Sequence, residues 1–431
     1  MSESSKKDAY APFRHASFRR FLAGGLLVQL GTAAQSLAIG WEIYERTREP
    51  FALGLVGLTQ AIPMLLLTLP AGYLADIMDR RRLVILSMIG ATLTSLCLAA
   101  VSFLAGPTWL VFLVLFFDSS FIRLGSPART AIQPLLVPRD VFESSIKWRT
   151  TLGHLSGVVG PALGGFLIAF HLTSAYLFSA VCSLVFMSMV LRTTIREEQR
   201  AVRGEMLKKV AEGIRFVWQR KVVLGAISLD LFAVLLGGAV YLLPVFAHRM
   251  AADPAGSPLG LTAEQILGAL RAAPALGASL MALTLAYMPS FRRTGRTLLL
   301  NVAGFGVATI VFGFSRNFWL SAFALFMTGA FDNVSMVVRH GVVQLSTPNE
   351  MRGRVSAVSA IFIGSSNELG GFESGLVAQL FSPVISVVSG GIGTIVVVLT
   401  WAGLFPRLRQ LGPMGGIRPE EPDTVRAEPP A

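Results

Sequence analysis

Seven charged side chains interrupt long apolar stretches of this 431-residue chain. A charge inside membrane hydrocarbon costs several kcal/mol, so it is kept where it pairs, carries a proton or binds a polar ligand. The seven residues are Asp118, Arg123, Asp230, Arg271, Asp332, Glu368 and Glu373. The carboxyl groups are candidate proton carriers, and the two arginines are candidate partners for an acidic ligand.

Steps of three and four residues place polar side chains on single faces of the predicted helices. The two clearest groups are Thr328, Asp332, Ser335 and Arg339, and Ser119, Arg123, Ser126 and Thr130. Two weaker groups are Gln29, Thr32 and Ser36, and Asp230, Gly237 and Tyr241. These faces predict a shared water-filled cavity for substrate and protons, with Asp118, Arg123, Asp230, Arg271, Asp332 and Glu368 as its candidate residues.

The same residues have a structural interpretation. An acid and an arginine in neighbouring helices can form a buried pair that only fixes packing. Both roles stay open for each residue, and Asp332 is favoured as proton carrier because of its expected burial. Arg339, near a helix end, fits membrane anchoring, and His154 fits hydrogen-bonded packing.

Composition places the chain in a membrane. It is 53% hydrophobic and 14% charged, with a mean hydropathy of +0.62, whereas soluble domains are about 25% charged. Apolar helices of about 20 residues match the hydrocarbon thickness. The chain is therefore expected to be an all-α membrane protein of twelve spans: residues 21–43, 52–75, 83–104, 108–129, 145–170, 173–191, 222–247, 264–288, 297–314, 318–338, 355–380 and 384–405.

Basic residues gather in alternate loops. Of the 37 Lys and Arg residues, 31 lie on the side that also holds both chain ends, and the positive-inside rule places that side in the cytoplasm. The net charge of +12 therefore mostly reflects the basic loops that set the membrane topology, and a nucleic-acid partner is not expected. The first 20 residues are polar and are not expected to form a cleavable signal peptide.

The polar stretch from residue 192 to 221 divides six spans from six. The predicted organisation is a cytoplasmic N-terminal arm (1–20), a first six-helix half (21–191), a cytoplasmic linker with an interfacial helix (192–221), a second six-helix half (222–405) and a disordered cytoplasmic tail (406–431).

An offset of 210 residues relates the two halves. It relates Arg129 to Arg339, Pro138 to Pro348 and Asp140 to Glu350, and it continues from Gly160 to Gly370 and from Gly165 to Gly375. Duplicated halves are typical of proteins whose binding site lies at the repeat interface.

Enzyme chemistry is not expected. The chain shows no Ser/His/Asp constellation, metal-ligand cluster or phosphate-binding glycine loop. Its two cysteines, Cys97 and Cys182, lie in separate apolar spans, so neither a disulfide nor a metal site is expected. No cofactor is expected either.

Two glycine-containing motifs predict close contacts. Residues 72–82 combine Gly72 and Asp76 with an arginine cluster that starts at Arg80, and Asp76 is placed to meet the N-terminus of a facing helix after Arg354. We expect Gly72, Asp76 and Arg80 to form a cytoplasmic gate. In span five, Gly160, Pro161, Gly164 and Gly165 form a helix-packing motif.

The chain resembles the major facilitator superfamily at these positions. Gly72, Asp76 and Arg80 match the loop between spans two and three, whereas Asp79 stands where the superfamily usually has Gly and Ile77 where it often has Arg. Residues 160–165 resemble the core of its antiporter signature, although Ser156 departs from the upstream glycine pattern.

Residues 347–357 and 366–370 resemble the subgroup that contains the bacterial enterobactin exporter and macrolide efflux proteins. The resemblance covers roughly residues 13–407. It implies a monomeric exporter in the bacterial inner membrane that works by rocker-switch alternating access, favours antiport, and uses a small-molecule substrate with protons as the coupling ion.

Proton-coupled efflux of an amphipathic siderophore-like metabolite or drug is thus the expected function. The candidate proton carriers are Asp118, Asp230, Asp332 and Glu368. Arg123 and Arg271 would favour an acidic substrate such as a catecholate over a cationic drug. Solute uptake and a non-transporting membrane sensor on the same scaffold are the alternatives.

Overall fold

The computed structural model describes residues 10–193, 206–253, 260–289 and 291–418. The described residues form helices and connecting turns without a β-strand. Eleven helices are long and apolar enough to cross a membrane. The twelfth, α13 (Arg352–Leu380), has the length but carries Glu368 and Glu373, which lower its hydropathy. The prediction of an all-α, twelve-span membrane fold is confirmed.

Each half contains six spans. The first half consists of α1 (Ala16–Thr47), α2 (Pro50–Ile77), α3 (Arg80–Phe103), α4 (Thr108–Ile132), α5 (Phe142–Phe170) and α6 (Leu172–Leu191). The second consists of α8 (Lys221–Leu236) with α9 (Leu243–Ala252), α10 (Ala263–Tyr287), α11 (Thr294–Phe314), α12 (Phe318–Leu345), α13 and α14 (Pro383–Leu404). Between the halves lies α7 (Met206–Gln219). Residues 194–205 of the predicted linker lie outside the described residues.

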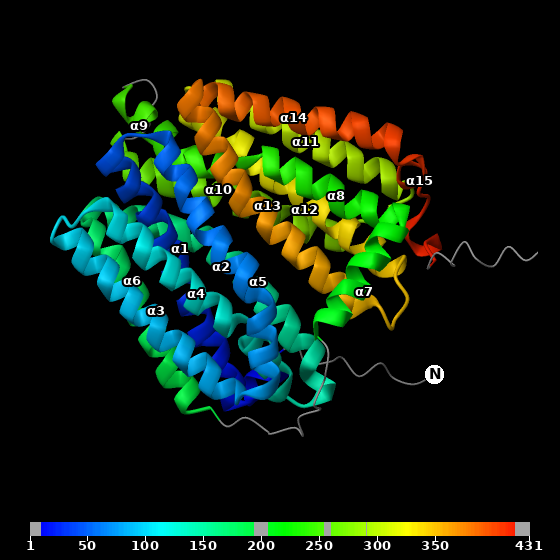
Figure 1. Ribbon diagram of the computed structural model, residues 1–431, viewed down its shortest axis with the longest axis horizontal. Helices are drawn as coiled ribbons and strands as arrows, with labels where there is room; N and C mark the ends of the chain where they lie inside the picture. The colour runs from blue at the N-terminus through cyan, green and yellow to red at the C-terminus, as the bar shows by residue number, and fades with distance from the viewer. Residues whose placement is uncertain (1–9, 194–205, 254–259, 290, 419–431) are drawn as a thin grey trace, which may run out of the picture.

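The halves contact each other mainly through two helix pairs, α2 with α13 and α5 with α10. Figure 1 shows that the halves meet near α9 and diverge toward α7. A single buried apolar cluster joins both halves at the α9 end, which we call the closed end. At the α7 end, the open end, each half has its own buried cluster.

The seventh span is broken, although the sequence predicts one continuous segment. Helix α8 stops at Leu236, and a 3-10 turn (Gly238–Leu242) leads into α9. Gly238 lies so close to the Gly370 carbonyl and the Ser374 side chain that any larger residue would clash. The break brings Tyr241 next to Gly371 of α13.

The chain after residue 405 differs from the predicted disordered tail. Helix α15 (Pro406–Arg409) places a buried Leu408 against the second half. The Thr294 amide donates to the Gly412 carbonyl at 3.2 Å, and the Met414 amide donates to the Phe291 carbonyl at 3.2 Å. Residues 419–431 lie outside the described part of the chain.

Candidate functional site

A cavity of about 250 Å³ lies between the two halves. It is lined from the first half by α1 and α2 and from the second half by the break before α9, by α10 and by α13. The lining residues are Ser36, Leu37, Gly40, Leu53, Val56, Gln60, Val240, Tyr241, Pro244, Leu267, Arg271 and Glu368. Five of these twelve residues are polar or charged and seven are apolar, so the wall offers both hydrogen-bonding groups and apolar surface to a small molecule.

Glu368 connects the halves at this cavity. Its Oε1 atom lies 3.4 Å from Nη2 of Arg123, which comes from α4 of the first half. Its Oε2 atom accepts a hydrogen bond from the Tyr241 hydroxyl. The carboxylate therefore has a counter-ion in one half and a hydrogen-bond donor in the other, although Glu368 and Arg123 are 245 residues apart.

Arg271 lines the same cavity from α10. Its Nη1 atom donates to the Val240 carbonyl at 3.3 Å. Glu368 is the one acidic residue among the described residues that line the cavity, and Arg123 already pairs with it. Arg271 is thus a positive charge in excess at the cavity wall.

Asp230 and Arg339 form a buried ion pair within the second half, between α8 and α12. Neither residue lines the cavity described above. Asp230 Oδ2 and Arg339 Nε have no partner among the described residues. Arg339 is buried, so it does not act as the membrane-surface anchor that its position near a helix end predicts.

Asp118 lies inside the first half and away from the cavity lining. It accepts hydrogen bonds from Thr94 Oγ1 at 2.6 Å and from Gln35 Nε2 at 3.1 Å. Asp332 is exposed on α12 and forms no hydrogen bond or ion pair with a described residue. Of the six predicted cavity residues, the structure brings three together at the cavity: Arg123, Arg271 and Glu368.

The predicted gate residues lie at the open end. Asp76 is exposed and forms no hydrogen bond or ion pair with a described residue, while Arg80 Nη1 donates to the Ala131 carbonyl at 3.5 Å. Asp79, the departure from the superfamily loop, caps α3 by accepting from the Arg82 amide at 2.8 Å. Arg354, at the start of α13, pairs instead with Glu212 of α7 at 2.5 Å.

The glycines of span five lie where helices approach closely. A side chain at Gly160 or Gly164 would run into Ala33 or Ala34 of α1. Gly165 faces Gly268 of α10 in the other half. The motif thus lies both at a contact within the first half and at a contact between the halves.

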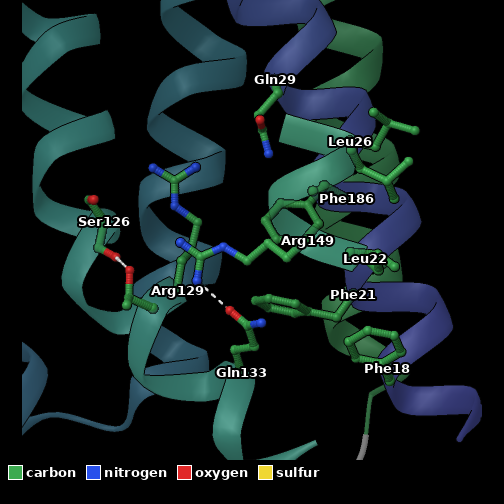
Figure 2. A pocket seen from close by; sticks show the side chains of 13 residues that line it. Phe18, Phe21, Leu22, Leu26, Gln29, Ser126, Arg129, Gln133, Arg149 and Phe186 are labelled. Atoms are coloured by element: carbon green, nitrogen blue, oxygen red, sulfur yellow. Dashed lines mark hydrogen bonds between the residues drawn. The ribbon is translucent and has the colours of Figure 1, made fainter. Parts of the chain in front are cut away.

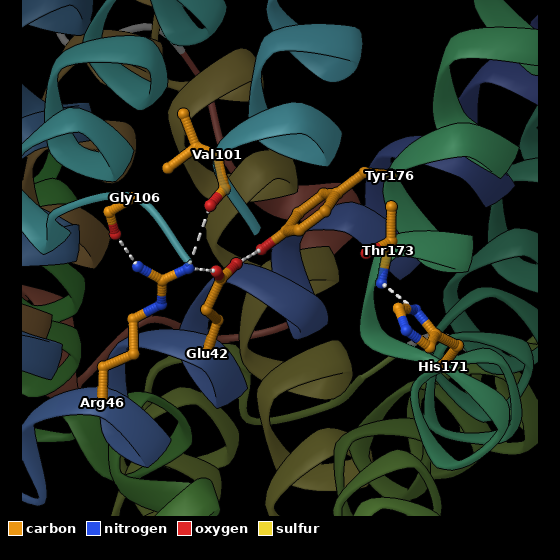
Figure 3. A network of polar contacts seen from close by, with 7 residues as sticks. All are labelled: Glu42, Arg46, Val101, Gly106, His171, Thr173 and Tyr176. Atoms are coloured by element: carbon orange, nitrogen blue, oxygen red, sulfur yellow. Dashed lines mark hydrogen bonds and ion pairs between the residues drawn. The ribbon is translucent and has the colours of Figure 1, made fainter. Parts of the chain in front are cut away.

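Two polar clusters at the closed end were not predicted from the sequence. In the first, Glu42 of α1 pairs with Arg46 and accepts from the Tyr176 hydroxyl (Figure 3). In the second, Oε1 of Glu45 lies 2.6 Å from Nε2 of His248, which belongs to α9. The spacing of four between Glu42 and Arg46 was a usable signal, but the predicted span one ended at residue 43.

A second cavity, of about 200 Å³, lies within the first half near the open end (Figure 2). Arg129 and Arg149 line it, together with three phenylalanines. Neither arginine is among the cavity residues predicted from the sequence, because a position near a helix end does not indicate which neighbouring helix a side chain faces.

A protein-family model described as "Transmembrane secretion effector" matches residues 7–413. The enterobactin exporter EntS of Escherichia coli O81 (strain ED1a) is 25% identical over 387 residues, which cover 89% of this chain and 90% of that protein. The EntS protein of Escherichia coli O1:K1 / APEC has the same identity and coverage.

Solved structures of transporters share the fold. A mutant of the nucleoside transporter NupG superposes with a TM-score of 0.75 at 13% identity, over 90% of this chain and 100% of that one. A bacterial homologue of the lysosomal transporter Spinster, inward-facing and occupied, gives 0.69 at 14% identity, over 93% and 98%. The matched family and the twelve-span architecture agree, and the chain belongs to the transmembrane secretion effectors of the major facilitator superfamily.

Proposed function

We propose that this multi-pass inner-membrane transporter exports an acidic amphipathic small molecule from the cytoplasm, in exchange for protons and by alternating access. One observation carries the proposal. The Arg123–Glu368–Tyr241 cluster joins the two halves beside a cavity that has Arg271 as an excess positive charge. Similarity to the enterobactin exporter supports the direction of transport and a siderophore-like substrate.

The charge at the cavity favours an acidic substrate over a cationic drug. A cation would have to approach Arg271 and compete with Arg123 for Glu368. An acid group instead gains a charge-assisted hydrogen bond from Arg271, which is roughly twice as strong as a neutral one. The apolar wall, with Leu37, Leu53 and Val56 among its residues, suits the uncharged part of an amphipathic molecule.

Alternating access has a physical basis in the two ends. If both chain ends lie in the cytoplasm, as the positive-inside rule predicts, the open end corresponds to the cytoplasmic side and the conformation to an inward-facing one. The Glu45–His248 contact and the shared apolar cluster then close the outer side. Opening that side requires these contacts to separate while the two clusters at the open end come together.

Glu368 is the proposed proton carrier. In the proposed exchange the substrate binds at Arg271 while Glu368 is ionised and paired with Arg123, and the proton and the substrate are bound in turn, never together. Protonation from the outer side would keep Glu368 from Arg123 after the substrate has left. Release of that proton to the cytoplasm would restore the ion pair seen here.

Transport into everted membrane vesicles with an imposed pH gradient tests the proposal. The probes are 2-naphthoate, its neutral amide 2-naphthamide and the cation 2-naphthylmethylammonium, which share one aromatic body. We expect accumulation of the anion, and loss of that accumulation in Arg271→Gln. Arg139→Gln, an exposed arginine outside the cavity, is the matched control. Equal transport of all three probes, or of the cation alone, would refute the proposed substrate class.

A further inference from the structure

The cavity near the open end is rich in hydrogen-bond donors. Arg129 and Arg149 both line it, and Arg149 Nη1 donates to Gln133 Oε1. Figure 2 shows Arg129, Arg149 and Gln133 around the same space. The Nε2 group of Gln133 is buried and has no acceptor among the described residues. An unmet buried donor costs roughly 1–3 kcal/mol, so a ligand acceptor at this point would be favoured.

No acidic side chain is among the described residues that line this cavity. Arg129 uses one donor on the Ile122 carbonyl at 3.1 Å. An Arg guanidinium has five donors, so most of the donor capacity of Arg129 and Arg149 is unused. Two guanidinium groups and a free amide, without a carboxylate to neutralise them, form a site for an anion.

The opposite wall of the cavity is apolar. It consists mainly of aromatic rings, Phe18 and Phe21 from α1 and Phe186 from α6 (Figure 2). Gly25 of α1 lines the same cavity, and an added side-chain carbon there would meet no atom within 4 Å. The cavity thus has room for an apolar or aromatic group next to the arginines. This arrangement matches an amphipathic acid, which carries an acid group on an apolar body.

Polar residues lead from this cavity to the central one. On α1, Gln29 lines the first cavity and Ser36 lines the second, and seven residues of helix span about 10 Å. On α4, Ser126 lines the first cavity, while Arg123 pairs with Glu368 at the second. Two helices therefore connect both cavities along faces with hydrogen-bonding groups.

We propose that the cavity formed by α1, α4, α5 and α6 is a loading site, where Arg129, Arg149 and Gln133 bind the acid group of an amphipathic substrate before it moves to the central cavity. The phenylalanine rings hold the apolar body. This proposal rests on the proposed function for the identity of the ligand as substrate. An anionic lipid headgroup offers the same chemistry, and the experiment separates the two sources.

Equilibrium binding to the purified full-length protein tests the loading site. The probes are tritiated 2-naphthoate and 2-naphthamide, and the protein is held in nanodiscs of phosphatidylcholine alone. We expect naphthoate to bind at least tenfold more tightly than naphthamide. Arg149→Gln should weaken naphthoate binding at least tenfold and leave naphthamide unchanged. Arg139→Gln, exposed at the same end of the protein, is the control for charge.

A second variant keeps both charges and fills the space. Gly25→Leu should reduce binding of both probes, because its side chain enters the open part of the cavity. Gly403→Leu is the matched control, since a side chain there also meets nothing within 4 Å but lies on α14. Unchanged naphthoate binding in both Arg149→Gln and Gly25→Leu would overturn the loading site.

A parallel set of nanodiscs contains phosphatidylglycerol. Naphthoate affinity that is unaffected by this lipid supports a substrate site, whereas displacement of naphthoate by the lipid would overturn the proposal in favour of a lipid site. Failure of the proposed function looks different: naphthoate would still bind and still depend on Arg149, but everted vesicles would not accumulate it.

Discussion

Asp230→Asn is the most direct test of how the intramembrane charges are used. The Asp230 carboxylate and the Arg339 guanidinium pair inside the second half, where both are buried. Loss of one partner leaves the other as an uncompensated buried charge, which destabilises a protein by about 3–5 kcal/mol. We expect a loss of that size in the free energy of unfolding.

The double variant Asp230→Leu with Arg339→Met should recover most of that loss. The pair is incompletely satisfied, because Asp230 Oδ2 and Arg339 Nε have no partner among the described residues. Replacing such a pair by apolar residues is often neutral or stabilising. The effects of the single variants should therefore not add, with a coupling energy of at least about 2 kcal/mol.

The assay is unfolding of the purified protein by SDS in mixed micelles, followed by tryptophan fluorescence. Glu143→Gln is the matched control, because Glu143 and Lys147 form an exposed pair at 2.8 Å, and such a pair contributes about 0.3–0.5 kcal/mol. A loss below about 1 kcal/mol for Asp230→Asn, or strictly additive variants, would refute the reasoning.

The same double variant decides whether Asp230 carries protons. If the pair only fixes packing, the folded double variant should keep transport driven by the pH gradient. If the variant folds and binds substrate but loses its response to the gradient, Asp230 is the carrier and the structural assignment is wrong.

Three further predictions concern the cavity and the two ends. Glu368→Gln should bind and exchange substrate but lose accumulation driven by a pH gradient in everted vesicles; an unchanged gradient response would exclude it as the carrier. Asp76→Asn should slow transport at an unchanged amount of protein in the membrane, because a helix-terminus contact contributes about 0.3–1 kcal/mol; normal vesicle rates would contradict a gate role. Glu45→Gln should weaken the contact between Glu45 Oε1 and His248 Nε2, which lie 2.6 Å apart, and so open the outer side more often. The reporter is Ser36→Cys at the central cavity, in a protein whose two native cysteines have been replaced. Its thiol should then react faster with a membrane-impermeant thiol reagent that is added from outside. Glu49→Gln, an exposed acid at the same end, is the control, and equal labelling in both variants would argue against an outer gate.

Features that depend on local sequence were predictable. Apolar segments long enough to span a membrane indicate the helices and their order, and the match to the family model confirms the membership in the superfamily that the short motifs indicated. The break after Leu236 was not predictable, because Gly237 and Gly238 are tolerable inside an apolar run. The role of Gly238 depends on the Gly370 carbonyl, which lies more than 130 residues away and approaches only in the folded protein.

The charged residues were predictable as a set but not as pairs. Helical spacing gives the face on which Arg123 or Asp118 lies, yet it carries no information about the neighbouring helix. Arg123 therefore could not be linked to Glu368 from sequence, nor Asp118 to Thr94 and Gln35. Partners across helices are set by packing, and packing also decides which charge reaches a cavity.

The internal repeat relates a buried, ion-paired arginine in one half to an arginine that lines a cavity in the other half. Arg129 and Arg339 are related by the offset of 210 residues and lie near the same end of equivalent helices. In the second half, α8 supplies Asp230 to neutralise Arg339. In the first half, α1 contains no acid between residues 16 and 41, and Arg129 lines a cavity instead. The repeated arginine is thus paired with an acid in one half, whereas in the other it lines a cavity that has no acidic residue among the described residues, and this difference is what makes the proposed loading site possible in the first half alone of the two equivalent positions.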